Sequence, residues 1–224
     1  MATRVHCLRS WTACAYLIES EAGLVLVDTG YPGNQHRVME KMRELGRDSL
    51  QLLFITHAHL DHYGCAAALR RMTGAPIAVH RADAAALARG QTPVRSARGF
   101  GKLGRLLVPL AERLLGPGPT PCDVLLDDGD DLRSFGLDAM LVHTPGHTAG
   151  SSSLLVEGRL AFVGDLLTGD GQPVMQHLYA DDWAAIPKSL ARVQALQPEW
   201  VYPGHGRHPL RGEAVQALEI AVTD

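Results

Sequence analysis

The sequence lacks most of the features that direct a protein to a membrane, a disulfide scaffold or nucleic acid. Its four cysteines include no C-x-x-C pair, which favours free thiols in a reducing, cytoplasmic compartment. Residues such as His6 and Arg9 interrupt the start, and no apolar run reaches the roughly eighteen residues of a membrane span. A formal charge of -3 supplies no positive field for nucleic acid. These absences argue against membrane and nucleic-acid partners and leave a small-molecule substrate as the expected partner.

The chain has the composition and patterning of an α/β protein. Hydrophobic residues make up 46% of its 224 residues, enough for one full core, so we predict a single domain over residues 1–224. Apolar runs of strand length lie at residues 15–18, 24–27, 52–55, 77–79, 139–142, 153–156, 160–163 and 200–202. Helix-like stretches lie between them, at residues 34–45, 62–72, 81–88, 183–196 and 212–222. This interleaving indicates sheets covered by helices on their outer faces.

Residues 90–121 interrupt this alternation and have the character of an insertion. The segment is basic, with a single acid, Glu112, against Arg95, Arg98, Lys102, Arg105 and Arg113. Leucines from Leu103 to Leu114 follow helical spacing, and Pro109 is expected to kink or divide the helix. Two interpretations stay open: an amphipathic helix packed on the body with its basic face in water, or a lid whose apolar face or arginines touch the substrate. The same leucines could instead bury against a second subunit in a homodimer.

Ligand-type side chains crowd into the segment ITHAHLDHYG, residues 55–64, at the end of an apolar run. Neutral imidazole and carboxylate are the donors that divalent zinc, iron or manganese accept. His57 and His59 form an H-x-H pair, and Asp61 and His62 follow at once. These two pairs cannot all face one ion, so the segment fits two metal ions better than one.

Three further candidate ligands each follow an apolar run and lie beside a glycine. They are His147 in HTPGHTAGSS, Asp165 in VGD and His205 in YPGHG. Glycine permits the tight backbone and close approach that such a loop needs. Because functional side chains are commonly placed on loops that a rigid scaffold positions, we expect these donors to meet the first cluster at one edge of the sheets.

Five motifs, read in order, resemble those of the metallo-β-lactamase superfamily: Asp28-Thr29-Gly30, THAHLDH, TPGHT, GD and PGHG. The resemblance covers nearly the whole chain. It implies an α/β fold, a four-layer αββα sandwich in which two mixed β-sheets are flanked by helices, with the metal site along one edge of the sheets.

The resemblance also implies a role for each ligand. The residues assigned to the first metal are His57, His59 and His147, and those assigned to the second are Asp61, His62 and His205. Asp165 would bridge the two ions. Asp28 would fix the orientation of ligands rather than bind metal, as carboxylates behind metal ligands commonly do.

Two divalent ions, most simply zinc with iron or manganese as alternatives, can bridge a hydroxide and polarise the oxygen of the group that it attacks. The resemblance therefore implies a metallo-hydrolase. Asp61 and Asp165 are the candidate catalytic residues. Asp165 would hold the pair of ions together, and Asp61 would orient the nucleophile or pass a proton to the leaving group.

The intact ligand set resembles that of the glyoxalase II group, which cleaves thioesters, and that of the metallo-lactonases, which open acyl-homoserine lactones. True β-lactamases of the superfamily usually replace a ligand, for example with a cysteine at the position of Asp165. Only about nineteen residues follow His205, so the glyoxalase II C-terminal domain is not expected and glutathione recognition stays open. We predict hydrolysis of a thioester or an ester, including a lactone. A mononuclear iron persulfide dioxygenase is the alternative from another class.

The substrate pocket is less clearly marked than the metal site. Lactonases often place a tyrosine shortly after the bridging aspartate, where this sequence has Thr168, so Tyr63, Tyr31 or Tyr179 would have to substitute. His177 and Tyr179 follow that aspartate by about a dozen residues. Together with Tyr63 they are the candidate pocket residues.

Overall fold

Strands form at every apolar run that the sequence marks, in a computed structural model that describes residues 3–169 and 171–220. The strands are β1 (Arg4–Ser10), β2 (Ala13–Ser20), β3 (Gly23–Val27), β4 (Leu52–Ile55), β5 (Ile77–His80), β6 (Ser96–Ala97), β7 (Val124–Leu126), β8 (Ala139–His143), β9 (Ser152–Val156), β10 (Leu160–Thr168), β11 (Val174–Met175), β12 (Tyr179–Ala180), β13 (Trp200–His205) and β14 (Leu210–Arg211). The helices are α1 (Gln35–Glu44), α2 (Leu60–Tyr63), α3 (Ala66–Thr73), α4 (Arg81–Arg89), α5 (Gly101–Leu115), α6 (Ala185–Ala195) and α7 (Gly212–Gln216), with a short 3-10 helix at Arg133–Phe135.

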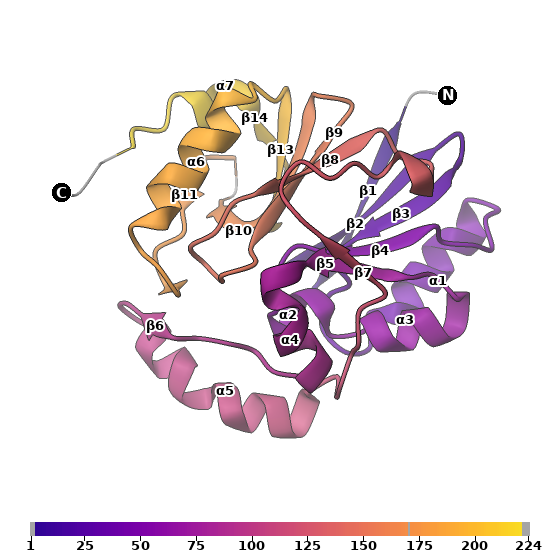
Figure 1. Cartoon of the computed structure of the whole chain (residues 1–224), viewed down its shortest axis with the longest axis horizontal. Coiled ribbons are helices and arrows are strands. Elements are labelled where there is room, and N and C mark those ends of the chain that lie inside the picture. Colours follow the sequence, from indigo (N-terminus) through magenta and orange to yellow (C-terminus); the bar gives the residue numbers. More distant parts are fainter. Residues whose placement is uncertain (1–2, 170, 221–224) are drawn as a thin grey trace.

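The strands fall into two mixed halves that face each other. The N-terminal half has the order β7-β5-β4-β3-β2, with β1 paired to β2, and the C-terminal half has the order β13-β10-β9-β8. A single pair, Ala13 with His205, joins β2 to β13, so the two halves, with β11 paired to β10 and β14 paired to β13, form one twelve-stranded sheet that folds over on itself. Figure 1 shows α1 and α3 outside the N-terminal half and α6 outside the C-terminal half. The predicted αββα sandwich is confirmed.

Period-two alternation along the strands gives the sandwich its layers. In β2 and β4, residues such as Leu17 and Leu53 pack against α1 and α3, whereas Tyr16 and Phe54 point to the opposite sheet. A third apolar cluster, which includes Val163, lies between the C-terminal half and α6. Three clusters between four layers account for the burial of both faces of each half.

The helix predicted over residues 62–72 is divided into α2 and α3. Its break lies at Gly64 and Cys65, where the chain turns to meet the loop after β3. Thr29 accepts a hydrogen bond from the Cys65 backbone, and a Cβ at Gly64 would lie 2.7 Å from the Gly30 carbonyl oxygen. Contact with the loop after β3 therefore overrides helical continuity. The last predicted helix is also shorter than residues 212–222, because α7 ends at Gln216 and residues 221–222 lie outside the described part of the chain.

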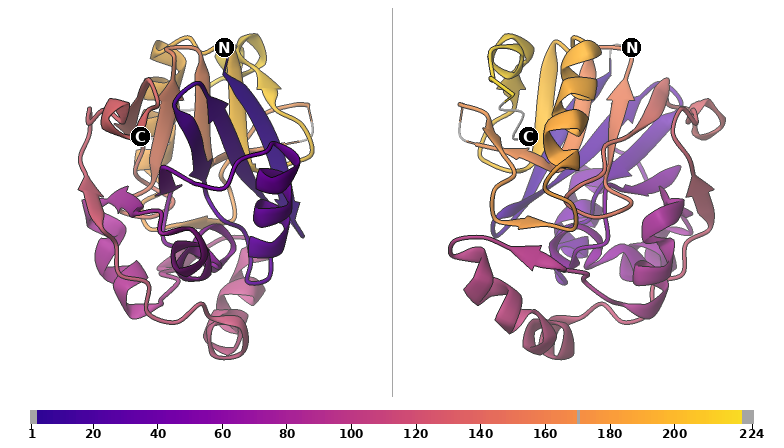
Figure 2. Two further views of the ribbon diagram at one scale, coloured as in Figure 1. Left: turned by 90° about the vertical axis from the view of Figure 1, so that its right-hand side faces the viewer. Right: turned by 60° about the vertical axis from the view of Figure 1, so that its left-hand side comes forward.

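The insertion contains one helix, α5, which continues through Pro109. The predicted division at Pro109 is wrong, because a proline in this exposed helix removes one backbone donor without ending the helix. The leucine stripe also points away from the body: Leu106 is 75% exposed and Leu110 is 54% exposed. The expectation that the apolar face packs on the same chain, or touches its substrate as a lid, is therefore wrong for these leucines. Figure 2 shows α5 at one end of the molecule, beyond the layers of the sandwich.

Four cysteines are free, and in the described residues no helix is both long and apolar enough to cross a membrane.

Candidate metal centre

Five elements bring the predicted ligands to one end of the sandwich. The turn after β4 carries His57 and His59, α2 carries the following Asp-His pair, and His147 lies between β8 and β9. Asp165 and His205 lie within β10 and β13, not on loops after them as expected, because both strands continue beyond their apolar runs. The structure thus brings all seven residues together while placing two of them on strands.

A glycine lets β10 approach the cluster closely. Gly164 has a φ of +51°, and a Cβ there would lie 2.7 Å from the hydroxyl oxygen of Thr56. The pairing of β10 with β13 is irregular on both sides of this residue. Because only glycine adopts this conformation without strain or collision, the adjacent Asp165 carboxylate can reach histidines of both halves.

The donors form two groups, in each of which the candidate ligand atoms lie within 4.8 Å of one another. The groups are His57, His59, His147 and Asp165, and Asp61, His62 and His205. Asp165 lies between them: its Oδ2 is 3.3 Å from the Nε2 of His147 and also 3.3 Å from the Nε2 of His205. Its Oδ1 is 3.1 Å from the Nε2 of His62. The geometry allows this carboxylate to contribute to either group.

Each histidine of the cluster uses one ring nitrogen for an outward hydrogen bond. Nδ1 is engaged in four of them, with the partners Thr56 for His57, Asp28 for His62, the Tyr179 carbonyl for His147 and the Thr12 carbonyl for His205. His59 is reversed, since its Nε2 donates to the Pro93 carbonyl at 2.7 Å. The second nitrogen of every ring is left facing the cluster. Outward bonds of this kind fix the tautomer and orientation of metal-binding imidazoles.

Three inward atoms of the cluster are buried without a hydrogen bond among the described residues: His57 Nε2, His62 Nε2 and Asp165 Oδ1, of which the last two lie 3.1 Å apart but not in hydrogen-bond geometry. Leaving a buried polar atom unpaired costs about 1–3 kcal/mol, so such atoms call for an occupant. Imidazole nitrogen and carboxylate oxygen are the donor set of zinc, iron and manganese. The residues therefore fit divalent metal ions.

Burial and charge set the protonation of these donors. Burial, together with neighbouring imidazoles, holds the pKa of His57 well below its usual range and lowers that of His147 to about 4. Burial opposes the charge of Asp165, but His205 and His62 outweigh it and hold the pKa of that carboxyl well below its usual range. At neutral pH the lone pairs of His57 and His147 and the charge of Asp165 are thus available to a cation.

The second group is more strongly coupled. Burial opposes a charge on His62 and His205, yet neighbouring carboxylates, with Asp165 first, raise the pKa of His62 well above its usual range and that of His205 to about 12. The same imidazoles outweigh burial at Asp61 and lower its pKa to about 2. A cation at this group has to displace protons from the two histidines.

Asp28 lies beneath the cluster and ties two ligand segments together. Its Oδ2 receives His62 Nδ1 at 2.8 Å, and its Oδ1 receives the Thr56 backbone N–H at 2.8 Å. The residue is buried and holds a φ of 57°, an uncommon conformation for a non-glycine residue. Its position behind the ligands is where the sequence led us to expect it.

A second buried carboxylate, Asp83 on α4, was missed by the sequence analysis. It accepts hydrogen bonds from the Ala58 N–H at 2.8 Å, the Thr148 hydroxyl at 2.7 Å and the Gly150 N–H at 2.7 Å. These donors flank His57, His59 and His147, so Asp83 joins the two loops of the first group. No feature of the sequence separates this aspartate from any other acid near a helix start.

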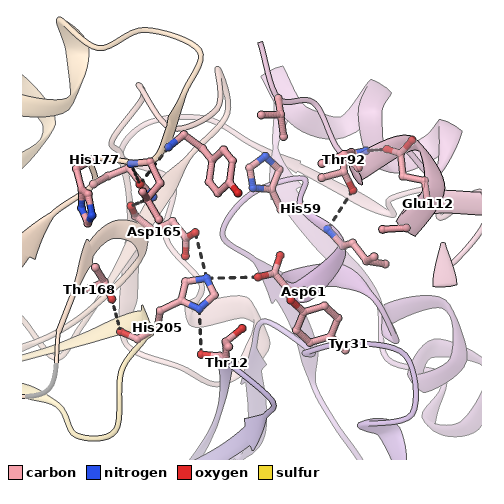
Figure 3. Close-up of a pocket in the computed structure, with 17 residues that line it drawn as sticks. Thr12, Tyr31, His59, Asp61, Thr92, Glu112, Asp165, Thr168, His177 and His205 are labelled. Atoms are coloured by element: carbon pink, nitrogen blue, oxygen red, sulfur yellow. Dashed lines mark hydrogen bonds and ion pairs between the residues drawn. The ribbon is translucent and has the colours of Figure 1, made fainter. Parts of the chain in front are cut away.

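A cavity of about 470 Å³ opens over the cluster. Asp61, Asp165, His59 and His205 lie at its inner end, and Figure 3 shows His205 between the two carboxylates with Thr12 on its other side. His177 and Tyr179 line this cavity, as the sequence led us to expect. Tyr63 does not: it is fully buried in the N-terminal core and donates to the Gln91 carbonyl. Placing Tyr63 in the pocket was wrong because α2 turns this side chain inward.

The opposite wall of the cavity comes from the insertion. Val108, Ala111 and Glu112 of α5 line it, together with Thr92 and Val94. Glu112 accepts a hydrogen bond from the Thr92 backbone N–H. This wall, hereafter the roof, is formed by the face of α5 that carries no leucine of the stripe. The insertion therefore covers the cavity, but with residues that the sequence analysis did not single out.

The N-terminal part of α5 is held close to β12 by two glycines. A Cβ at Gly101 would lie 2.6 Å from the Leu178 carbonyl oxygen, and one at Gly104 would overlap the Tyr179 hydroxyl. The guanidinium of Arg98 stacks over the ring of Trp183, 4.1 Å from its centroid. These contacts fix one end of the roof against the segment that also holds His147.

Residues 13–205 match the protein-family model described as the metallo-β-lactamase superfamily. A β-lactamase-like protein 2 homolog of Drosophila melanogaster is 26% identical over 200 residues, which are 85% of this chain and 57% of that protein. This chain therefore spans little more than half of that relative. A hydroxyacylglutathione hydrolase of Haemophilus influenzae is 28% identical over 166 residues, 70% of this chain and 68% of that protein.

Solved structures share the fold over most of the chain. A protein crystallised in a di-iron-bound form is 28% identical, with a TM-score of 0.70, and the match covers 94% of this chain and 96% of that one. A B3 metallo-β-lactamase has a TM-score of 0.75 at 23% identity, with 99% of this chain and 100% of that chain covered.

Proposed function

The chain belongs to the metallo-β-lactamase superfamily, and we propose that it is a metallo-hydrolase that cleaves a thioester or an ester of a small molecule. The proposal includes two divalent ions at the cluster, with zinc, iron and manganese as the candidates. It names the three histidines of the first group and the Asp-His-His set of the second as ligands, with Asp165 shared. A thioester is preferred because several relatives, including the Haemophilus influenzae protein, are hydroxyacylglutathione hydrolases.

One observation carries the proposal: five imidazoles and two carboxylates converge with their free donor atoms inward, and three of those atoms are buried without a partner among the described residues. A purely structural cluster would pair these atoms with each other or with backbone. The cluster also lies at the inner end of a cavity of about 470 Å³, a size suited to a small molecule.

When bound, two divalent cations lower the pKa of a water molecule and polarise the carbonyl that is attacked. The side chains around them have separate tasks. Asp61 faces the cavity and is ionised at neutral pH, since its pKa is about 2 despite burial, so it can accept a hydrogen bond from the attacking water and orient it. Burial and the Asp61 charge raise the pKa of Tyr31 and of Tyr179, which keeps both hydroxyls protonated as donors toward substrate oxygen.

A lactone is the alternative substrate for the same machinery, and the observation that favours it is the presence of Tyr31 and Tyr179 in the cavity lining. Either hydroxyl can assist a departing alkoxide, which is a poorer leaving group than a thiolate and gains more from a donated proton. The tyrosine function is thus supplied by positions other than Thr168, whose hydroxyl donates to the His205 carbonyl.

The test is metal analysis of the purified protein followed by assay against thioesters, lactones, phosphodiesters and a chromogenic β-lactam. We expect two divalent ions per chain and highest kcat/KM for a thioester. Turnover of lactones without thioesters would reverse the preference between the two substrates. Phosphodiester hydrolysis alone would contradict both, and one iron per chain with consumption of O2 when a persulfide is added as the substrate would identify a dioxygenase instead.

A further inference from the structure

A second cavity of about 290 Å³ adjoins the first. It is formed by the turn between β1 and β2, the segment before α1 and the C-terminal end of α5, and its lining includes Arg9, Trp11, Tyr31, Asn34, Arg37 and Leu115. Tyr31 lines both cavities, so the second lies next to the first. No predicted ligand and no residue of the proposed chemistry other than Tyr31 lies in it.

The lining of the second cavity contains two arginines and no acid. Neither Arg9 nor Arg37 forms an ion pair with a carboxylate among the described residues, and the Arg37 guanidinium donates a hydrogen bond to the Arg9 carbonyl at 2.8 Å. Some exposed arginines elsewhere are paired, for example Arg81 with Asp127 and Arg192 with Asp128, whereas others, such as Arg43, form no ion pair among the described residues. The two guanidinium groups therefore leave a positive charge uncompensated at the rim of a concave site.

The start of α1 adds to this positive potential. Gly33 and Asn34, which precede the helix, line the cavity, and the first turn contains no acidic residue. The N-terminal end of a helix carries a partial positive charge that favours an anion, although here the N–H groups of His36 and Arg37 already donate to the carbonyls of Gly33 and Asn34. Asn34 is buried, and its Oδ1 has no hydrogen-bond partner among the described residues. Because that oxygen is itself buried, we assign it no contact with the ligand.

An aromatic pair forms the other wall of the second cavity. Trp11 is 76% exposed, and its ring centroid lies 5.1 Å from that of Tyr31. Trp11 also has a φ of 54°, a strained conformation for a bulky residue that persists only where the surroundings impose it. The next residue, Thr12, accepts the hydrogen bond from His205 Nδ1 at 2.9 Å. One turn thus holds a ligand of the cluster and presents an indole at the second cavity.

We propose that the second cavity binds the acidic end of the substrate's leaving group, a thiol or alcohol that carries a carboxylate or phosphate. Arg9 and Arg37 bind the anion, and the Trp11–Tyr31 pair covers the chain that connects it to the bond being cleaved. This inference rests on the proposed function, which places the bond to be cleaved at the metal cluster and the leaving group toward the second cavity. The substrates are then esters and thioesters with an anionic leaving group. The metal cluster alone does not distinguish these from substrates with an uncharged leaving group.

Direct binding tests the site without any turnover. The probes are S-methylglutathione, which carries carboxylates, and S-methyl-coenzyme A, which carries phosphates; methylation prevents the sulfur from binding metal as a thiolate. Each is titrated into the metal-loaded protein while tryptophan fluorescence is followed, with Trp11→Phe to assign the signal. We expect one probe or both to change the Trp11 signal. Arg9→Gln and Arg37→Gln should each weaken that binding by about three- to tenfold, the range for an exposed charged contact.

Arg43→Gln is the matched control, because Arg43 lies on the same helix, is exposed and is absent from the lining of the cavity. Equal losses in Arg43→Gln and Arg37→Gln would mean that only the general charge of the surface matters and would overturn the proposal. So would binding that no arginine variant changes. The two probes distinguish the sources of the anion: preference for one identifies a carboxylate-bearing or a phosphate-bearing leaving group.

Turnover gives the second measurement. For a thioester of the preferred thiol, Arg9→Gln should raise KM by about three- to tenfold with little change in kcat, and should affect a thioester of uncharged N-acetylcysteamine far less. Equal losses on both substrates would contradict a role in binding the anion. If no ester or thioester is hydrolysed while the probes still bind through the arginines, the proposed function fails and the anion site stands.

Discussion

The inner end and the roof of the substrate cavity are built in opposite ways. At the inner end, every histidine of the cluster is held by an outward hydrogen bond, and two buried aspartates, Asp28 and Asp83, join the loops from below. The roof is held mainly at one end of α5, near Tyr179, and by the contact of Glu112 with Thr92. Its outer face is a row of exposed leucines.

This difference separates the two tasks of the site. Metal ligands need fixed positions, and a network of buried bonds supplies them. A surface that recognises substrates tolerates fewer contacts and more variation, as loops and insertions around catalytic centres usually do. We therefore expect substitutions at the inner end to change metal content and stability, and substitutions in the roof to change substrate use with the metals retained.

Asp165→Ala should have the largest effect, because Asp165 is the one donor close to both groups. We expect the metal content to fall from two ions per chain to about one or none, and kcat/KM to fall by at least about a thousandfold, equivalent to roughly 4 kcal/mol of lost stabilisation of the transition state. Metal analysis and steady-state kinetics check this. Asp48→Ala, at an exposed aspartate, is the control. Full activity with two metals in Asp165→Ala would refute the ligand assignment.

Asp83→Ala tests the support beneath the ligands. The change leaves the buried backbone N–H groups of Ala58 and Gly150 unpaired and removes one of the two partners of the Thr148 hydroxyl, which should cost about 3 kcal/mol of folding free energy and lower Tm by roughly 6–12 °C. Metal affinity should fall by about ten- to a hundredfold, as for other outer partners of ligands. Thermal unfolding and metal titration measure both effects.

Asp138→Asn is the matched control for that experiment, because the Asp138 side chain is 62% exposed and pairs with Arg133 at the surface. It should change stability by less than about 0.5 kcal/mol. If Asp83→Ala were no more destabilising than Asp138→Asn, the three hydrogen bonds to Asp83 would have no structural role.

The inner end could be predicted from the sequence, and the roof could not. His57 and its six companions belong to motifs in which the chemistry of the residue type and its spacing both point to a metal. Asp83 belongs to no motif, and its importance appears only when two distant loops meet over it. For α5, helical periodicity identifies the residues that share a face but not what that face meets. The leucine stripe was therefore recognised, while its direction was not.

Tyr63 illustrates the same limit on a smaller scale. It stands next to two expected ligands, yet the helix that carries Asp61 and His62 turns Tyr63 into the core, where it lies beside Leu69 in the same apolar cluster. Neighbours in sequence on a helix point about 100° apart, so adjacency to a ligand gives no information about the cavity.

Gly104→Ala tests how the roof is attached. The new Cβ would overlap the Tyr179 hydroxyl, so α5 or the Tyr179 ring must move. We expect kcat/KM to fall by about tenfold with metal content unchanged, and stability to fall by about 1–3 kcal/mol, the usual cost of overpacking. Tyr179→Phe removes the colliding oxygen. In that background Gly104→Ala should cost measurably less, and a double-mutant cycle with no coupling would show that the helix is not positioned by this contact.

The smallest effect on catalysis is expected at the outer face of the roof. We propose that the leucine stripe of α5 buries against a second copy of the chain, because a row of exposed leucines is unfavourable in water. Leu106→Glu combined with Leu110→Glu should convert a dimer to a monomer in light scattering while kcat changes less than about twofold, since neither residue lines the cavity. Met72→Glu, at an exposed methionine on α3, should leave the dimer intact. A wild-type protein that is monomeric at every concentration would exclude the dimer. A second copy of the chain would then not be what covers the leucines of α5.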